Sequence, residues 1–91
     1  MRKIDGKFHV EADEIVKTSN GERLPSDEPV FLLRARNHLA LPLLKHYLQL
    51  SLEDDCTDYQ INGVEAAIVQ FEAFQTKHPE RMKQPGITRG L

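Results

Sequence analysis

Residues 57–79 read TDYQINGVEAAIVQFEAFQTKHP, and this stretch decides the C-terminal part of the fold. Apolar side chains recur in it every three or four residues, which places them on one face of an α-helix. They are Ile61, Val64, Ala67, Ile68, Phe71 and Phe74. Pro79 cannot continue a helix and restricts the residue before it. The stretch therefore predicts a helix over residues 58–78.

Two starts compete for this helix. Thr57 and Gln60 have the spacing of a capping box, in which the hydroxyl accepts the N3 amide and the amide side chain reaches back. Asn62 precedes Gly63 and is a second residue of the capping type. An early turn from Thr57 with a distortion at Asn62 and Gly63 would reconcile the two starts.

A leucine-rich stretch precedes this helix and predicts another one. It leaves only a narrow polar strip, at Lys45, Gln49 and Glu53. Pro42 suits the first turn of a helix and not its interior, which predicts a helix over residues 41–53. A helix that is apolar on most sides is buried on most sides, by the rest of the fold or by a partner.

The first third of the chain reads as strands. Alternating apolar and polar residues predict a strand over 8–12, and β-branched residues predict a second over 14–18. Asn20-Gly21 is a strong hairpin signal, because a type I′ turn needs positive φ at both central positions. The clearest alternation lies at residues 30–36, where we predict the third strand.

The period of the hydrophobic pattern changes from two to 3.6 after Asn37. We therefore expect an α+β fold, in which a small antiparallel three-stranded sheet at the N-terminal side packs against two antiparallel helices at the C-terminal side. Residues 1–82 would form this single domain, and residues 83–91 a flexible C-terminal tail. The expected core includes Phe31, Leu44, Leu48, Ile68 and Phe71.

Composition limits the classes of protein to which this chain can belong. The chain has 91 residues, a net charge of −2 and one cysteine, so no disulfide forms within it. Its longest apolar run, residues 39–44, is far shorter than the ~20 residues that span a bilayer. Residues 1–10 lack the apolar core of a signal peptide. We therefore expect a cytoplasmic protein.

The sequence shows no catalytic or cofactor motif. It has no Gly-rich phosphate loop and no nucleophile elbow, and its histidines do not share a ligand face, so we expect neither cofactor nor metal. The acidic residues at 53–58 lack the alternating ligands of a calcium loop and suit the start of the following helix. Cys56 lies among these carboxylates, which disfavour its thiolate. The absence of motifs argues against an enzyme without excluding one.

Charged residues of the same sign are grouped in segments of the sequence. Residues 29–52 hold bases and no acid, and residues 53–74 hold acids and no base. Arg34, Arg36 and His38 share one face of the predicted strand as it runs into the helix, and guanidinium groups suit carboxylates and phosphates. The candidate residues for binding an anion or a partner are Arg34, Arg36, His38, Lys45, Arg81 and Lys83.

These features favour a small non-enzymatic accessory or regulatory module that binds another protein, with a homodimer as one form of that binding. An alternative is a nucleic-acid or phosphate-binding protein that uses Arg34, Arg36 and the basic tail, against which the net charge of −2 counts. A second alternative is a small enzyme with a site at a subunit interface. In a purely structural interpretation the arginines pair with Glu11, Glu14 or Glu22 across the sheet.

Overall fold

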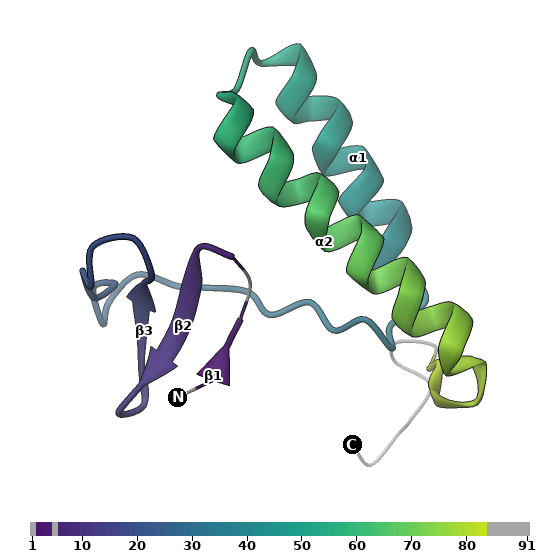
Figure 1. Cartoon of the computed structure of the whole chain (residues 1–91), viewed down its shortest axis with the longest axis horizontal. Coiled ribbons are helices and arrows are strands. Elements are labelled where there is room, and N and C mark those ends of the chain that lie inside the picture. Colours follow the sequence, from purple (N-terminus) through teal and green to yellow (C-terminus); the bar gives the residue numbers. More distant parts are fainter. Residues whose placement is uncertain (1, 5, 84–91) are drawn as a thin grey trace. The chain divides into compact units, whose positions relative to one another are not determined.

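The computed structural model describes residues 2–4 and 6–83. The chain divides into two compact units, residues 1–31 and residues 32–91, and each unit is described by itself. The strands of the first unit are β1 Arg2–Lys3, β2 Phe8–Glu11 and β3 Glu14–Lys17 (Figure 1). The helices of the second are α1 Ala40–Glu53, α2 Asp58–Lys77 and the 3₁₀ helix η1 Pro79–Arg81. The predicted α+β class is confirmed.

β2 and β3 form an antiparallel hairpin in which Phe8 pairs with Lys17. Its turn lies at Ala12 and Asp13, whose φ values of 48° and 66° are in the left-handed region. Ala12 adopts this conformation at a steric cost, whereas aspartate tolerates it better, and the two residues are not an Asn-Gly type of turn signal. Val16 of β3 is fully buried and is the core of this unit.

The turn predicted at Asn20-Gly21 is also present. Gly21 has a φ of 73°, and its amide donates to the carbonyl of Lys17 at 2.8 Å. The chain that returns from this turn pairs with β3 only through an isolated bridge between Val16 and Arg23. This turn therefore leads into a single bridge and not into a further strand.

The strand predicted over residues 30–36 is wrong. No ladder forms in this segment, and the carbonyl of Arg34 accepts from the amide of Asn37 at 3.1 Å, which makes a turn. Phe31 is 88% exposed, so its predicted place in the core is wrong as well. Alternation favours a strand only where a neighbouring strand is available to pair with it.

The predicted sheet, with its third strand at residues 30–36, is therefore not formed. The sheet consists of the β2–β3 hairpin, along which the two-residue β1 pairs with β2. Packing of the sheet on the helices, and a single domain over residues 1–82, stay predictions. Residues 84–91 of the predicted tail lie outside the described residues, whereas Lys83 takes part in backbone hydrogen bonds.

α1 and α2 are antiparallel, as predicted, and lie side by side (Figure 1). α1 begins one residue earlier than expected, where the Oδ1 atom of Asn37 accepts from the amide of Leu39 at 2.8 Å. The buried apolar residues of the helices are Ala40, Val64 and Ile68. Ile68 is thus buried as predicted, whereas Leu44, Leu48 and Phe71 are only half-buried. No helix among the described residues combines the length and apolar character that a membrane crossing requires.

Thr57 caps α2. Its Oγ1 atom accepts from the amide of Gln60 at 3.2 Å, which confirms this start. The helix runs unbroken past Asn62 and Gly63, so the proposed distortion is absent. The side-chain amide of Gln60 donates to the hydroxyl of Tyr47 at 2.7 Å and so ties α2 to α1.

A tight turn joins the two helices. Asp55 has a φ of 53°, and the amide of Cys56 donates to the carbonyl of Ser51 at 3.1 Å. The amide of Asp55 donates to the carbonyl of Leu52 at 3.4 Å, which completes a Schellman motif. The turn places the acidic residues directly before α2, as predicted.

Candidate functional site

Backbone hydrogen bonds join the segment before α1 to the segment after α2. The amide of Lys83 donates to the carbonyl of Arg36 at 2.7 Å, and the amide of His38 donates to the carbonyl of Lys83 at 3.1 Å. The Nδ1 atom of His38 lies 3.2 Å from the same carbonyl. Residues distant in sequence thus meet at one end of the helix pair. We call this the basic end, and it holds Arg34, Arg36, His38, Arg81 and Lys83.

Phe74 supports one side of the basic end. The guanidinium carbon of Arg81 lies 4.8 Å from the centre of the Phe74 ring, a cation–π contact. The ring of His78 lies 5.2 Å from the same ring, centre to centre. A single half-buried aromatic side chain therefore holds the C-terminal turn and Arg81 in place.

Lys45 is the one candidate residue that the structure places elsewhere. It projects from the middle of α1, and its Nζ atom lies 3.6 Å from the Oε2 atom of Glu72 on α2. This pair is exposed on both sides and contributes little to stability. Lys45 is therefore a helix–helix contact and not a member of the basic end.

Arg34 and Arg36 lie in a turn and not on a strand face. Arg34 is exposed and Arg36 is half-buried. Over residues 2–4 and 6–83, neither guanidinium forms an ion pair within 4.0 Å. The basic end therefore presents two positive charges without a counter-charge in the described part of the chain.

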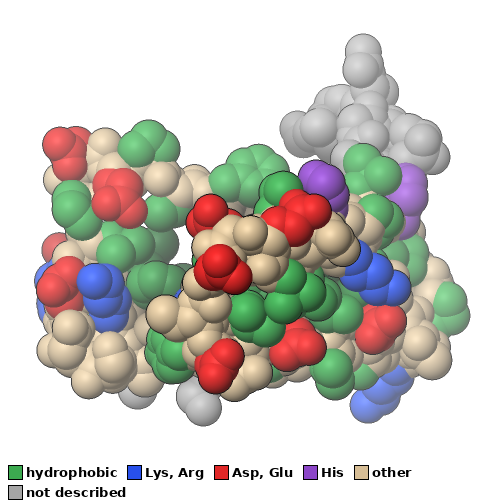
Figure 2. Space-filling view, turned by 90° about the horizontal axis from the view of Figure 1, so that it is seen from above, with side chains coloured by type: hydrophobic (Ala, Val, Ile, Leu, Met, Phe, Trp, Pro, Cys, Tyr) green, Lys and Arg blue, Asp and Glu red, His purple; other side chains and the backbone are tan. Residues whose placement is uncertain are grey.

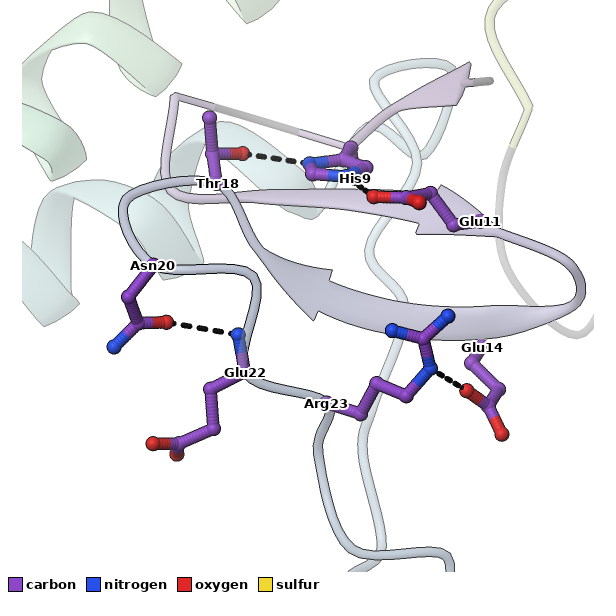
Figure 3. Close-up of polar contacts among 7 residues, drawn as sticks. All are labelled: His9, Glu11, Glu14, Thr18, Asn20, Glu22 and Arg23. Atoms are coloured by element: carbon purple, nitrogen blue, oxygen red, sulfur yellow. Dashed lines mark hydrogen bonds and ion pairs between the residues drawn. The ribbon is translucent and has the colours of Figure 1, made fainter.

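The acids considered as structural partners of these arginines pair within the hairpin unit instead. Glu14 pairs with Arg23 (Figure 3). Glu22 lies 2.9 Å from the Nζ atom of Lys17. Glu11 contacts His9. These acids therefore have partners within the hairpin unit, and the purely structural interpretation of Arg34 and Arg36 stays a prediction.

The His9–Glu11 contact gives the hairpin a pH dependence. His9 is buried between Thr18, 2.9 Å from its Nδ1 atom, and Glu11, 2.5 Å from its Nε2 atom (Figure 3). The hydrogen bond from His9 lowers the pKa of Glu11 from its ordinary value of 4.5. Because the folded pKa is the lower one, this contact stabilises the hairpin above that ordinary value, and the stabilisation is lost as the pH falls through the folded pKa.

We therefore expect the unfolding midpoint of the wild type to fall on acidification below about pH 4.5 more steeply than that of Glu11→Gln. Thermal unfolding of both proteins between about pH 6 and 3, followed by circular dichroism, measures the difference. Parallel curves for the two proteins would contradict the assigned role of Glu11.

One face of α1 exposes a row of apolar side chains. Leu39, Leu43, Tyr47 and Leu50 follow one another at intervals of four, four and three residues, which aligns them along the helix. Each is between 47% and 52% exposed. We call this row the α1 stripe. The surplus of leucine in the sequence signalled an uncovered helix face, but it did not show which residues form it.

An open hollow of about 400 Å³ lies where the stripe meets the helix turn. It is lined by Tyr47, Leu50, Ser51, Glu53, Asp54 and Cys56. Ser51 is 2% exposed, and its Oγ atom finds no hydrogen-bond partner among the described residues. Sequence reasoning did not predict the hollow, because it depends on how the turn folds back.

The turn itself forms an acidic end, made of Glu53, Asp54, Asp55 and Asp58. Figure 2, seen from above in Figure 1 and thus onto this turn, shows a central group of acidic side chains with apolar ones between them, and basic and histidine side chains further to the right. The helix pair is therefore charged oppositely at its two ends, with the α1 stripe between them.

This arrangement is suited to recognition. No three His, Cys, Asp or Glu side chains of the described residues gather into a group that could hold a metal ion. The stripe offers apolar contact area, and the two ends offer charges of opposite sign. No family model, no curated protein and no solved structure matches the chain.

Proposed function

We propose that the protein is a non-enzymatic binding module whose α1 stripe docks on another protein chain. The observation that carries the proposal is the row of four apolar side chains that α1 leaves exposed. Contiguous exposed apolar surface of this kind is uncommon on a monomer and marks interaction sites. An apolar helix face is also a common way of binding a protein groove or another helix.

Tyr47 is the anchor of this surface. Its hydroxyl accepts from the side-chain amide of Gln60, which holds the ring in place. A fixed aromatic ring loses little entropy on binding and supplies a large contact area. The charged ends beside the stripe add orientation, because opposite charges steer a partner more than they tighten its binding.

The basic end is the observation that favours the alternative, phosphate or nucleic-acid binding. Its arginines are suited to phosphate oxygens. The acidic end of the same helix pair and the net charge of −2 oppose a polyanion, whereas they are compatible with a protein surface. Protein binding is therefore the better proposal.

The test removes the stripe while keeping the helix. We expect Leu43→Gln/Leu50→Gln to retain the helical circular dichroism and thermal midpoint of the wild type, because both side chains are half exposed and glutamine forms helices well. The proteins that the wild type captures from its native host should be lost from this variant, as identified by mass spectrometry.

Val69→Gln is the matched control. It removes an apolar side chain of 64% exposure from the outer face of α2 and should leave capture unchanged. The same proteins recovered by wild type and by Leu43→Gln/Leu50→Gln would refute the stripe as the binding surface.

A further inference from the structure

We infer that the chain docked on the α1 stripe is a second copy of this protein, bound antiparallel so that the basic end of each copy faces the acidic end of the other. This inference rests on the proposed function, since it uses the same stripe. It adds the identity of the partner, the direction of its helix and the charges that select it.

The spacing of the stripe fits a two-fold symmetric pair. In such a pair both copies use the same surface. A contact from one residue of the first copy to another residue of the second copy is therefore repeated with the copies exchanged. With two α1 helices antiparallel about the middle of the stripe, Leu39 lies opposite Leu50 of the second copy, and Leu43 lies opposite Tyr47. Every apolar side chain of the stripe then meets another one.

The same register brings the charges together. In the same antiparallel arrangement, the basic end of each copy lies beside the acidic end of the other. Because the pair is symmetric, this match occurs at both of its ends. A parallel pair in register would instead set basic end against basic end and acidic end against acidic end, and like charges across an interface oppose association.

Charges of one copy cannot neutralise each other over this distance. α1 has 14 residues and at 1.5 Å per residue is about 21 Å long. The Debye length at physiological salt is about 8 Å, so the two ends hardly interact within one chain. Each end thus keeps its like charges gathered, and an antiparallel second copy supplies the missing counter-charges.

The hollow at the acidic end completes the match. Its apolar part is lined by Tyr47 and Leu50, and its rim by Glu53 and Asp54. In this register Leu39 of the second copy lies over the apolar part, and the basic end of that copy lies near the acidic rim. The lining of this hollow favours an apolar side chain with a cation a short distance away.

The pair should be weak. One face of a helix of this length buries less than the roughly 800 Å² per partner that stable interfaces bury. We therefore expect a reversible dimer with a dissociation constant in the micromolar range or above, weaker at high salt than at low salt. Sedimentation equilibrium over that range of concentration, at two salt concentrations, measures both.

Charge reversal tests the antiparallel match. Arg34→Glu/Arg36→Glu cancels the net positive charge of the basic end, and Glu53→Lys/Asp54→Lys cancels the net negative charge of the acidic end. Each variant alone should dimerise at least about tenfold more weakly than the wild type. Their equimolar mixture should associate more tightly than either variant alone, because one end of the mixed pair keeps its opposite charges. Glu65→Lys, on the exposed face of α2, is the control and should dimerise normally.

Cysteine pairing tests the direction independently. In a Cys56→Ser background, a chain with Leu39→Cys mixed with a chain with Leu50→Cys should form the mixed disulfide faster than either chain forms one with itself. Faster pairing of like positions would overturn the antiparallel direction, and a mixture of charge variants that stays monomeric would overturn the charge match.

A wild type that sediments as a monomer up to about millimolar concentration would overturn the second copy as partner. The proposed function fails separately, when neither self-association nor the capture of other proteins depends on Leu43 and Leu50. The two failures are therefore distinguishable.

Discussion

Replacing Ile68 by alanine is expected to destabilise the helix pair by about 2–4 kcal/mol, the cost of deleting a buried branched side chain. Ile68 is 8% exposed and lies in the middle of α2, on the side where the apolar residues gather. A chain of this size has a total stability on the order of 5–10 kcal/mol, so the loss is a large part of it. Urea unfolding followed by the helical circular dichroism signal measures the change.

Val69→Ala is the matched control, because it shortens the neighbouring exposed side chain in the same helix. We expect it to change the free energy of unfolding by less than about 0.5 kcal/mol. Equal losses from the two substitutions would mean that α2 is rotated from the orientation described.

Replacing Phe74 by alanine is expected to cost about 2 kcal/mol and to loosen the basic end. The Phe74 ring packs against Arg81 and His78, so its removal deprives the C-terminal turn of its apolar support. Thermal unfolding measures the first effect. Sedimentation measures the loosening of the basic end, which we expect to appear as a weaker and less salt-dependent self-association.

Phe74→Leu separates packing from the cation–π contact. Leucine keeps much of the apolar volume of phenylalanine and lacks the ring. Phe74→Leu should therefore recover most of the stability that Phe74→Ala loses, while the cation–π contact of Arg81 stays absent. A thermal midpoint for Phe74→Ala equal to that of the wild type would contradict the anchoring role of this ring.

Local signals predicted the helices well. The helix expected over 41–53 begins at Ala40 and ends at Glu53, and the one expected over 58–78 ends at Lys77. Capping by Thr57 and termination before Pro79 involve only neighbouring residues, so the sequence suffices to find them. The strands at 8–12 and 14–18 were found for the same reason, since a hairpin pairs residues close in sequence.

Contacts between distant residues were not predictable in this way. The segment at 30–36 has the alternation of a strand, but a strand also needs a neighbour, and alternation says nothing about one. The turn at Ala12 and Asp13 lacks the glycine or asparagine that most strongly marks positive φ, and Ala12 disfavours it, so no strong turn signal marks it.

The residues of the basic end were grouped from the sequence, but their geometry was not predicted. Arg34, Arg36 and His38 were grouped because of a strand that does not form. They lie near Arg81 and Lys83 because the backbone of Lys83 bonds to that of Arg36 and His38, a contact between segments far apart in sequence. Their role in binding stays a prediction, as does that of the α1 stripe.

Val30, Phe31 and Leu32 form an exposed apolar run without a charge. Segments of this composition stack between chains into cross-β aggregates when nothing interrupts them. Pro29 and Arg34 flank the run, and a proline and a charge at the flanks of such a segment oppose its stacking. These two residues are thus expected to oppose aggregation of the concentrated protein. Arg34→Glu retains a charge at this position, so it lowers the positive charge of the basic end without opening the run to aggregation.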